Sequence, residues 1–209
     1  MVIKNGSSVL KGIQDKMSGM PKNRGLHDRE AKRAEIIGAA RELFVSDGFE
    51  RTSISRLAKA VGITANTLYW YFEDKDDILV AVLTAIVTED AADYAEVADH
   101  PLAERLEWLV GRLRRVGPLV STVHERATKS EVINIWHNGF HSYSESLFSA
   151  DIAASGLSGP DADAMIRIGT FVVEGLLTHA PSPEASRAVI DQLVDAISRG
   201  RSPEPPTVD

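Results

Sequence analysis

The chain of 209 residues contains no cysteine, and aromatic residues make up only 6% of it. Without cysteine there is no disulfide bond and no thiolate metal ligand, as expected for a protein of a reducing compartment. No segment approaches the roughly 20 consecutive apolar residues that span a bilayer, and no apolar stretch of signal-peptide length follows the first residues. We therefore expect a cytoplasmic protein with no membrane partner.

The sequence also lacks the short motifs that mark common catalytic sites. It contains no GxSxG, P-loop or GxGxxG pattern. We predict no catalytic residue, no cofactor and no enzymatic activity. The length is sufficient for one small and one medium domain with a substantial core.

Charge is divided unevenly along the chain. The whole sequence carries a formal net charge of −7, which by itself argues against a nucleic-acid partner. Up to residue 75, however, 13 Lys and Arg stand against 9 Asp and Glu (net +4), and from residue 76 onwards 10 stand against 21 (net −11). Because local charge sets the field that a polyanion meets, the N-terminal part can approach DNA while the acidic remainder faces away.

The most specific pattern lies in residues 48–79, GFERTSISRLAKAVGITANTLYWYFEDKDDIL, which predict two short helices joined by a glycine turn. Thr52 is a good N-cap for the first helix. The apolar residues of that helix recur at i, i+3, i+4 and i+7: Ile54, Leu57, Ala58 and Val61. Gly62 supplies the positive φ of the turn, and Thr64 caps the second helix, residues 65–71. This is a helix-turn-helix arrangement, whose second helix presents its N-terminal residues to the major groove.

The first turn of the second helix suits direct contact with bases. Ala65, Asn66 and Thr67 are small or polar, so the backbone can approach the bases closely. Asn66 can bond bidentately to adenine, and Ala65 or the methyl group of Thr67 can touch a thymine methyl. Leu68 and Phe72, four residues apart, are expected to hold the helix to the core.

The second half of this helix is aromatic. Tyr69 and Tyr71 can donate their phenolic hydroxyls to phosphate oxygens, which fixes the register on DNA without reading its sequence. Lys75 can neutralise one more phosphate. For Trp70, packing and DNA contact are equally good interpretations.

As a set, these residues resemble the DNA-binding module of the tetracycline-repressor (TetR) family of bacterial one-component regulators. The matching elements are Gly48-Phe49, Thr52-Ser53, Leu57-Ala58, Val61-Gly62-Ile63-Thr64, Thr67-Leu68-Tyr69, Tyr71-Phe72, Lys75 and Ile78-Leu79. The preceding helix matches too, and its inward-facing residues are Ile36, Ala40, Leu43 and Phe44. The resemblance covers roughly residues 29–80.

The resemblance implies roles for individual residues. Backbone contacts fall to Thr52, Tyr69, Tyr71 and Lys75, and groove-facing roles fall to residues 64–67. The complete set of predicted DNA-binding residues is Thr52, Ser53, Thr64, Ala65, Asn66, Thr67, Tyr69, Trp70, Tyr71 and Lys75.

Beyond the module nearly every segment predicts helix, with no convincing strand and no internal repeat. The predicted fold is all-α, with an N-terminal three-helix helix-turn-helix DNA-binding domain followed by a helical-bundle ligand-binding and dimerisation domain. The expected boundaries are 1–27 for a flexible basic extension, 28–74 for the DNA-binding domain, 75–200 for the ligand-binding and dimerisation domain, and 201–209 for a C-terminal tail. The extension is interpreted as a solvated tail, and an arm that reaches phosphates or the minor groove is the alternative.

Two apolar helices are expected near the end of the chain, at residues 161–179 and 184–198. Their apolar faces are wider than one intramolecular contact needs, although they could simply close the core of the monomer. In the family that the module resembles, the last two main helices pair with their copies in a four-helix bundle, which implies a homodimer. The predicted interface residues are Phe171, Val172, Gly175, Leu176, Val189, Leu193 and Ile197. In such a dimer the two DNA-binding domains lie one DNA turn apart, about 34–36 Å, which requires a palindromic operator.

The middle helices mix aromatic residues with a few polar tips, as small-molecule sites do. The candidates for an effector pocket are Tyr94, Trp108, His124, Trp136, His137, Phe140, His141 and Tyr143. Trp136 and Phe140, four residues apart, are equally well explained as core residues. No cluster of charged residues indicates the chemical class of the ligand.

His137 and His141 share a helix face, and His124 is a possible third metal ligand. Without a carboxylate at a fixed spacing or an HExxH pattern this signal is weak. Hydrogen-bonded or solvated histidines are the preferred interpretation, and we predict no metal. A helical metal-dependent hydrolase is the rival function from another class, but it leaves residues 48–79 unexplained.

The sequence therefore predicts a DNA-binding transcriptional regulator. We expect a homodimeric repressor that binds a palindromic operator in double-stranded DNA and is released by a small-molecule effector. A transcriptional activator of the same fold is the alternative. A nucleoid-type structural DNA binder is a third interpretation, which would protect DNA without a discrete palindrome.

Overall fold

A computed structural model describes residues 24–199, and within this range the chain forms nine α-helices and no strand, which confirms the predicted all-α class. The helices are α2 (Arg24–Ser46), α3 (Ile54–Ala60), α4 (Ala65–Tyr69), α5 (Lys75–Tyr94), α6 (Leu102–Arg115), α7 (Gly117–Ala127), α8 (Glu131–Ala154), α9 (Gly159–His179) and α10 (Pro183–Arg199). The predicted C-terminal tail and most of the predicted N-terminal extension lie outside the described residues. None of the helices within residues 24–199 is both long and apolar enough to cross a bilayer.

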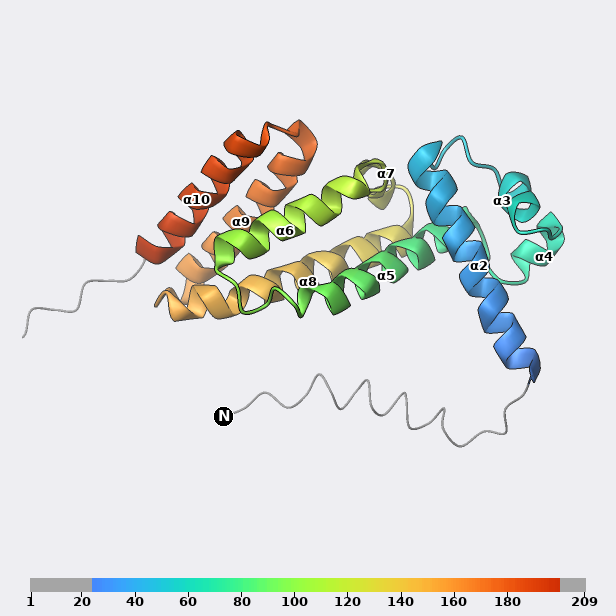
Figure 1. Cartoon of the computed structure of the whole chain (residues 1–209), viewed down its shortest axis with the longest axis horizontal. Helices are drawn as coiled ribbons and strands as arrows, with labels where there is room; N and C mark the ends of the chain where they lie inside the picture. The colour runs from blue at the N-terminus through green and yellow to red at the C-terminus, as the bar shows by residue number, and fades with distance from the viewer. Residues whose placement is uncertain (1–23, 200–209) are drawn as a thin grey trace, which may run out of the picture.

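The helices α2, α3 and α4 form a group at one end of the molecule, and α9 and α10 stand at the other end (Figure 1). Between these ends, α5 and α8 run alongside each other, and α8 also packs against α7 and α9. The helix α6 packs against both α9 and α10. The helix-turn-helix segment is therefore presented at one end, away from the two C-terminal helices.

The helix α2 anchors the N-terminal group to the rest of the chain. Ile36, Ala40 and Phe44 recur on one helix face and are fully or almost fully buried, as the spacing predicts. The fourth residue of the predicted stripe, Leu43, is only half-buried. Through this face α2 packs against α3, α5 and α7.

The turn between α3 and α4 has the predicted chemistry, but the cap of α3 is shifted by one residue. Ser53, not Thr52, is the N-cap, and its hydroxyl accepts a hydrogen bond of 3.2 Å from the backbone N–H of Arg56. Gly62 has a φ of +67°, the left-handed conformation that the sequence predicts for it. Thr64 caps α4, which ends at Tyr69, two residues earlier than expected.

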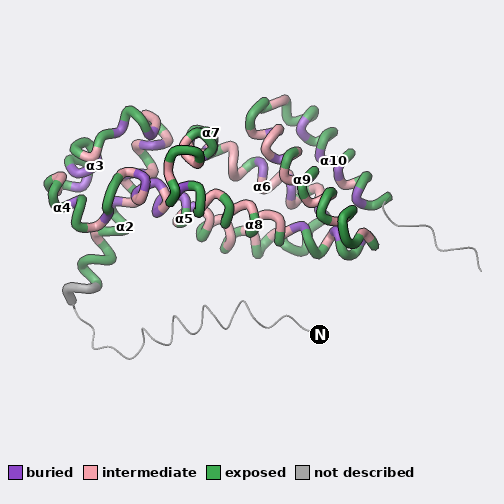
Figure 2. The backbone as a smooth tube through the Cα atoms, turned by 180° about the vertical axis from the view of Figure 1, so that it is seen from behind, coloured by how far each residue is buried: buried purple, intermediate pink, exposed green. Residues whose placement is uncertain are grey.

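Buried apolar side chains form two cores. The first includes Phe44, Leu68 and Ile133, and it joins α2, α3 and α4 to α5, α7 and the start of α8. The second includes Leu106 and Ile190, and it joins α6, the end of α8, α9 and α10. Buried positions accordingly gather where the helices face one another (Figure 2). Because the first core runs across the predicted boundary at residue 74, the helix-turn-helix group is packed firmly onto α5 and α7.

Candidate nucleic-acid interface and internal pocket

The first turn of α4 is capped by Thr64 and faces solvent. The Thr64 hydroxyl accepts a hydrogen bond of 3.1 Å from the Thr67 backbone N–H and lies 2.9 Å from the Thr67 hydroxyl. Leu68 is fully buried and fixes the helix to the first core, as its spacing with Phe72 predicts. Asn66 is exposed, with its amide free to meet a partner.

Two large aromatic side chains extend this surface into solvent. Tyr69 is 52% exposed and Trp70 is 76% exposed, although burying an indole would remove a large apolar area from water. The guanidinium of Arg29, from α2, lies 5.9 Å from the centre of the Trp70 ring. Tyr71 is half-buried against the first core. Exposed aromatic and basic groups side by side form a surface suited to a phosphate backbone.

Thr52 does not belong to this surface. The residue is fully buried, its hydroxyl donates to the carbonyl oxygen of Gly48 at 2.9 Å, and its N–H donates to that of Phe49 at 3.1 Å. Both donors of Thr52 are used inside the chain, so the structure does not support its predicted phosphate contact. Ser53 is exposed, and its hydroxyl proton remains available while the oxygen caps α3.

Lys75 is also turned inward. Its side chain is only 23% exposed, and its ammonium group donates to the Phe49 carbonyl oxygen at 3.0 Å. The same group lies 4.1 Å from the centre of the Phe49 ring and 3.9 Å from a carboxylate oxygen of Glu50. In this structure Lys75 ties the start of α5 to the loop before α3, which does not support its predicted role as a free phosphate contact.

Basic residues that the sequence interpretation missed lie on or near α3. Lys59 is exposed in the last turn of α3, and Arg56 is exposed one turn earlier, paired with Asp47. The apolar spacing of Leu57 and Ala58 marks the inward face of α3, and both residues are buried. The basic residues on the opposite face could therefore have been found from the same spacing.

A network of charges connects the helix-turn-helix group to α7. The guanidinium of Arg126 donates to Asp76 at 2.8 Å and to Glu50 at 2.9 Å, and it lies 4.9 Å from the centre of the Phe49 ring. Burial by itself raises the pKa of Asp76, but hydrogen bonds from Arg126 and Ser130 outweigh it and lower the pKa overall. The hydrogen bond with Asp76 raises the pKa of Arg126. The pair is charged on both sides, and it lies between α5 and α7.

An internal pocket lies between the two cores. All eight predicted pocket residues, from Tyr94 in α5 to Tyr143 in α8, line one cavity of about 110 Å³, together with residues of α6, α7 and α9. One water needs only about 10–15 Å³ measured in this way. Members of both cores, such as Val123 and Phe148, contribute to its wall. A molecule held here would touch helices of both cores at once.

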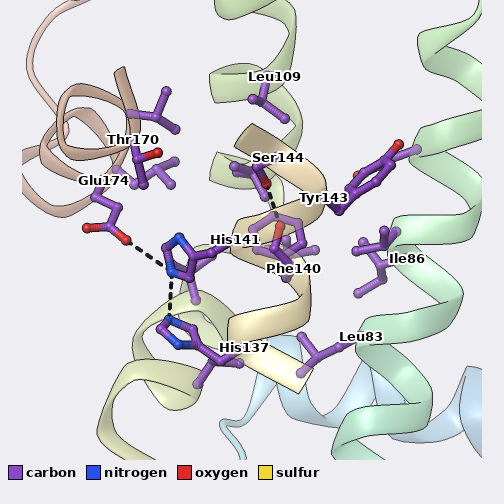
Figure 3. A pocket seen from close by; sticks show the side chains of 18 of the residues that line it. Leu83, Ile86, Leu109, His137, Phe140, His141, Tyr143, Ser144, Thr170 and Glu174 are labelled. Atoms are coloured by element: carbon purple, nitrogen blue, oxygen red, sulfur yellow. Dashed lines mark hydrogen bonds and ion pairs between the residues drawn. The ribbon is translucent and has the colours of Figure 1, made fainter. Parts of the chain in front are cut away.

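The walls of the pocket are aromatic and aliphatic, and the polar groups gather at two places. Trp136 and Phe140 stack with ring centres 5.4 Å apart, and Tyr94 meets Trp108 edge to face at 5.7 Å. Tyr143 lies on the side of the pocket that faces α5 (Figure 3), and burial raises the pKa of its hydroxyl. Tyr143 therefore remains a neutral hydrogen-bond donor near neutral pH.

The second polar place holds three histidines and a carboxylate. His141 and His137 meet through their Nε2 atoms at 2.9 Å, and His141 Nε2 lies 3.4 Å from Glu174 Oε1 (Figure 3). His124 Nε2, from α7, lies 3.8 Å from the same oxygen. Burial lowers the pKa of His137, and the neighbouring histidines add to this shift. Glu174 was missed from the sequence because it comes from α9, far along the chain from the histidines.

The structure divides the residues predicted for a dimer interface. Leu176, Leu193 and Ile197 are buried in the second core, so the structure gives them an intramolecular role instead. Phe171 is 67% exposed and Val189 is 42% exposed. Val172 and Gly175 are half-buried, and Ile168, which the prediction omitted, is exposed one turn before Phe171.

Comparison with known proteins agrees with these features. The family profile described as bacterial regulatory proteins, tetR family, matches residues 36–82. The HTH-type transcriptional repressor AcnR of Corynebacterium diphtheriae is 27% identical over 184 residues, which cover 72% of this chain and 94% of that protein. The fatty acid metabolism regulator protein of Bacillus subtilis is 33% identical over 57 residues, which cover 27% of this chain but only 29% of that protein.

Solved structures share the whole fold. A transcriptional regulator from Rhodococcus sp. Rha1 superposes with a TM-score of 0.68 at 20% identity, over 80% of this chain and 96% of that one. The regulator FadR of Bacillus subtilis, solved in complex with stearoyl-CoA, superposes with a TM-score of 0.58 at 18% identity, over 80% of this chain and 98% of that one. The helix-turn-helix region with its exposed α4 thus matches the TetR family of bacterial regulatory proteins, and the helical bundle behind it has the fold of solved transcriptional regulators.

Proposed function

We propose that the protein is a homodimeric repressor that binds a palindromic operator through α4 and leaves it when a small amphipathic molecule enters the internal pocket. The observation that supports this proposal most strongly is the exposed first turn of α4, held by the Thr64 cap and anchored by buried Leu68. The bound operator would lie on DNA in the cytoplasm. The repressor function of AcnR belongs to that relative and supports the same sign of control here.

On DNA, the proposed division of labour follows exposure. Asn66 and Thr67 face the base edges, because they are exposed at the N-terminal end of α4. Tyr69, Trp70 and the exposed hydroxyl of Ser53 face phosphates, which position the helix without reading sequence. Lys59 adds a positive charge at the end of α3.

The pocket favours an effector with an aromatic or aliphatic body and polar ends. Its walls contain Trp108, Trp136 and Phe140, while hydroxyl, imidazole and carboxylate groups such as Tyr143 and Glu174 offer hydrogen bonds. FadR was solved with stearoyl-CoA, and a regulator from Saccharomonospora viridis with this fold (TM-score 0.61) was solved with choline. The fold therefore accommodates unlike ligands, and the lining of each pocket must select its own.

The proposed signal passes through α7. This helix lines the pocket with His124 and contacts the DNA-binding group through Arg126, two residues later. An effector that moves α7 would shift Asp76 and Glu50 with it. Because these residues lie in α5 and in the loop before α3, the position of α4 would change as well. Such a ligand shifts the population only as far as its affinities for the two arrangements differ.

The proposed dimer uses the exposed faces of α9 and α10. Ile168 and Phe171 leave apolar area in water on α9, and Val189 does so on α10. Gly175 lies on the same face of α9, one turn beyond Phe171, and would let a partner helix approach closely. A two-fold axis through this face would present two α4 helices to one side of a DNA duplex.

Selection of bound fragments from a pool of random DNA tests the proposal. The purified chain is expected to enrich a palindrome whose half-sites are about 10 base pairs apart. Amphipathic small molecules are then added to the complex, and release is measured by fluorescence anisotropy. Enrichment of no common sequence would contradict the proposal and favour a structural DNA binder instead.

A further inference from the structure

We propose that the pocket contains a binding site for a divalent transition metal of the Zn²⁺ class, formed by His124, His137, His141 and Glu174. The three histidines offer ligand atoms that all lie within 4.8 Å of one another. This site lies in the proposed effector pocket. Only its effect on DNA binding rests on the proposed function, because metal binding itself is measured without DNA.

The geometry of the cluster approaches a tetrahedral site. With metal–ligand bonds of about 2.0–2.1 Å, neighbouring ligand atoms in a tetrahedron lie roughly 3.3 Å apart. The pairs here measure 2.9 Å between His137 and His141, 3.4 Å between His141 and Glu174, and 3.8 Å between His124 and Glu174. These are three of the six pairs, and the histidine ligand atoms all lie within 4.8 Å of one another, so a metal between them requires side-chain rotations that bring His124 closer to His137 and His141.

The chemistry of the donors selects the metal class. Three imidazole nitrogens and one carboxylate oxygen suit Zn²⁺ and similar ions, whereas Mg²⁺ and Ca²⁺ require oxygen ligands. Glu174 would offset part of the metal charge inside a mostly apolar cavity. A chain of hydrogen bonds between the same groups is the alternative, and it would leave the cluster without metal affinity.

The site would join three helices. His124 belongs to α7, His137 and His141 to α8, and Glu174 to α9. A bound metal would hold α7 against the other two and so restrain Arg126, two residues beyond His124, which contacts Asp76 and Glu50. Metal occupancy should therefore change the affinity for the operator.

Equilibrium dialysis of the metal-stripped, full-length protein against ZnSO₄ tests the proposal. We expect one Zn²⁺ per chain, no comparable uptake of Mg²⁺, and visible absorption bands of tetrahedral coordination when Co²⁺ replaces Zn²⁺. Loss of a residue that only supports a metal ligand costs about 10–100-fold in affinity, so His141→Ala should lower the affinity by at least about 100-fold. Glu174→Gln, which keeps the side-chain shape, should weaken binding and alter the Co²⁺ spectrum.

The matched control is His179→Ala, because His179 also lies on α9 but is exposed and outside the cluster. It should bind Zn²⁺ as the wild type does. Failure of the wild type to bind stoichiometric Zn²⁺, or equal binding by the His141→Ala and wild-type proteins, would overturn the site. If the wild-type protein binds the operator but takes up no metal, the metal site is overturned and the proposed repressor function stays intact. If it takes up metal but binds no operator, only the proposed repressor function is overturned. Zn²⁺ uptake with unchanged operator affinity would overturn the regulatory consequence.

Discussion

Asn66 is the residue on which sequence reading depends most directly. It is exposed in the first turn of α4, and the proposed bidentate contact from its amide to adenine would account for about 1–3 kcal/mol of discrimination. Asn66→Ala should weaken operator binding by that amount and relax the preference at one base pair. Anisotropy titrations with the operator and with single-base variants measure both effects.

Trp70→Ala is the matched comparison for Asn66→Ala. Trp70 is 76% exposed and contacts little of the core, so its loss should weaken binding to all DNA sequences alike. If Trp70→Ala relaxed the base preference and Asn66→Ala did not, the roles given to the two residues would be reversed.

Lys75 carries a prediction that the structure changes. Because its ammonium group donates to the Phe49 carbonyl oxygen, Lys75→Ala should reduce the free energy of unfolding, by on the order of 1 kcal/mol. The salt dependence of DNA binding should stay the same, since no phosphate contact is lost. Thermal unfolding and titrations at two salt concentrations measure the two quantities. A decrease of the salt slope by about one, with unchanged stability, would restore the phosphate contact.

At the residue scale, sequence patterns predicted the local role of a residue more reliably than whether its side chain faces the core or solvent. Thr64 caps α4 and Gly62 takes a positive φ, because both roles follow from local backbone requirements. Thr52 and Ser53 are adjacent hydroxyl residues, and only the packing of the loop against Gly48 decides which one is buried. Lys75 is tied down for a similar reason, by a carbonyl group that lies far from it along the chain.

At the scale of elements, the contact between α5 and α7 gives a pH dependence. The pKa of Asp76 is lowered in the folded chain, so its pair with Arg126 adds stability at pH values above the ordinary carboxyl pKa, near 3.8. This stability is lost as the pH falls from that value through the lowered pKa. The free energy of unfolding should therefore decrease more steeply in this range for the wild type than for Asp76→Asn. Denaturant titrations at a series of acidic pH values measure it, and equal slopes would contradict the assignment.

The proposed pairing of α9 and α10 with a second copy can be tested by placing a charge on the exposed face. Phe171→Asp should yield a monomer at micromolar concentration in sedimentation, because a buried and unpaired carboxylate is strongly unfavourable. Ile135→Asp is the control, since Ile135 on α8 is similarly exposed (64%) but lies outside the proposed interface. A dimer that survives Phe171→Asp, or one that Ile135→Asp disrupts, would move the interface elsewhere.

The helices themselves were largely foreseeable, since apolar periodicity and Pro or Gly breaks place most of them within a few residues. The second half of α4 is an exception, because the pattern predicts helix up to residue 71 and the helix ends at Tyr69. Which apolar face each helix turns inward was less predictable. Leu193 and Ile197 looked like interface residues, but α10 packs against α6 and α9, and both residues are buried in the second core. Glu174 was not predicted as a pocket residue for the same reason, because only the packing of α9 against α8 brings it to the histidines.

At the scale of the whole molecule, two cores with a pocket between them support the proposed control of DNA binding by a ligand. The first core holds α2, α3 and α4 firmly to α5 and α7, and the second holds α9 and α10 to α6 and α8. A ligand between the cores can change their relation without unfolding either one. In the proposed dimer, the C-terminal helices would then keep the two protomers together while the distance between their helix-turn-helix groups changes.

In the proposed complex, α4 of each protomer enters the major groove, and the two copies lie on one side of the duplex. Anisotropy titrations on the selected operator, at low ionic strength and without effector, test this arrangement most directly when repeated with about five base pairs inserted between the half-sites, which turns them to opposite sides. We expect two protomers per operator and a large loss of affinity on insertion. Absence of binding to any duplex, or affinity that does not change with the insertion, would contradict this arrangement.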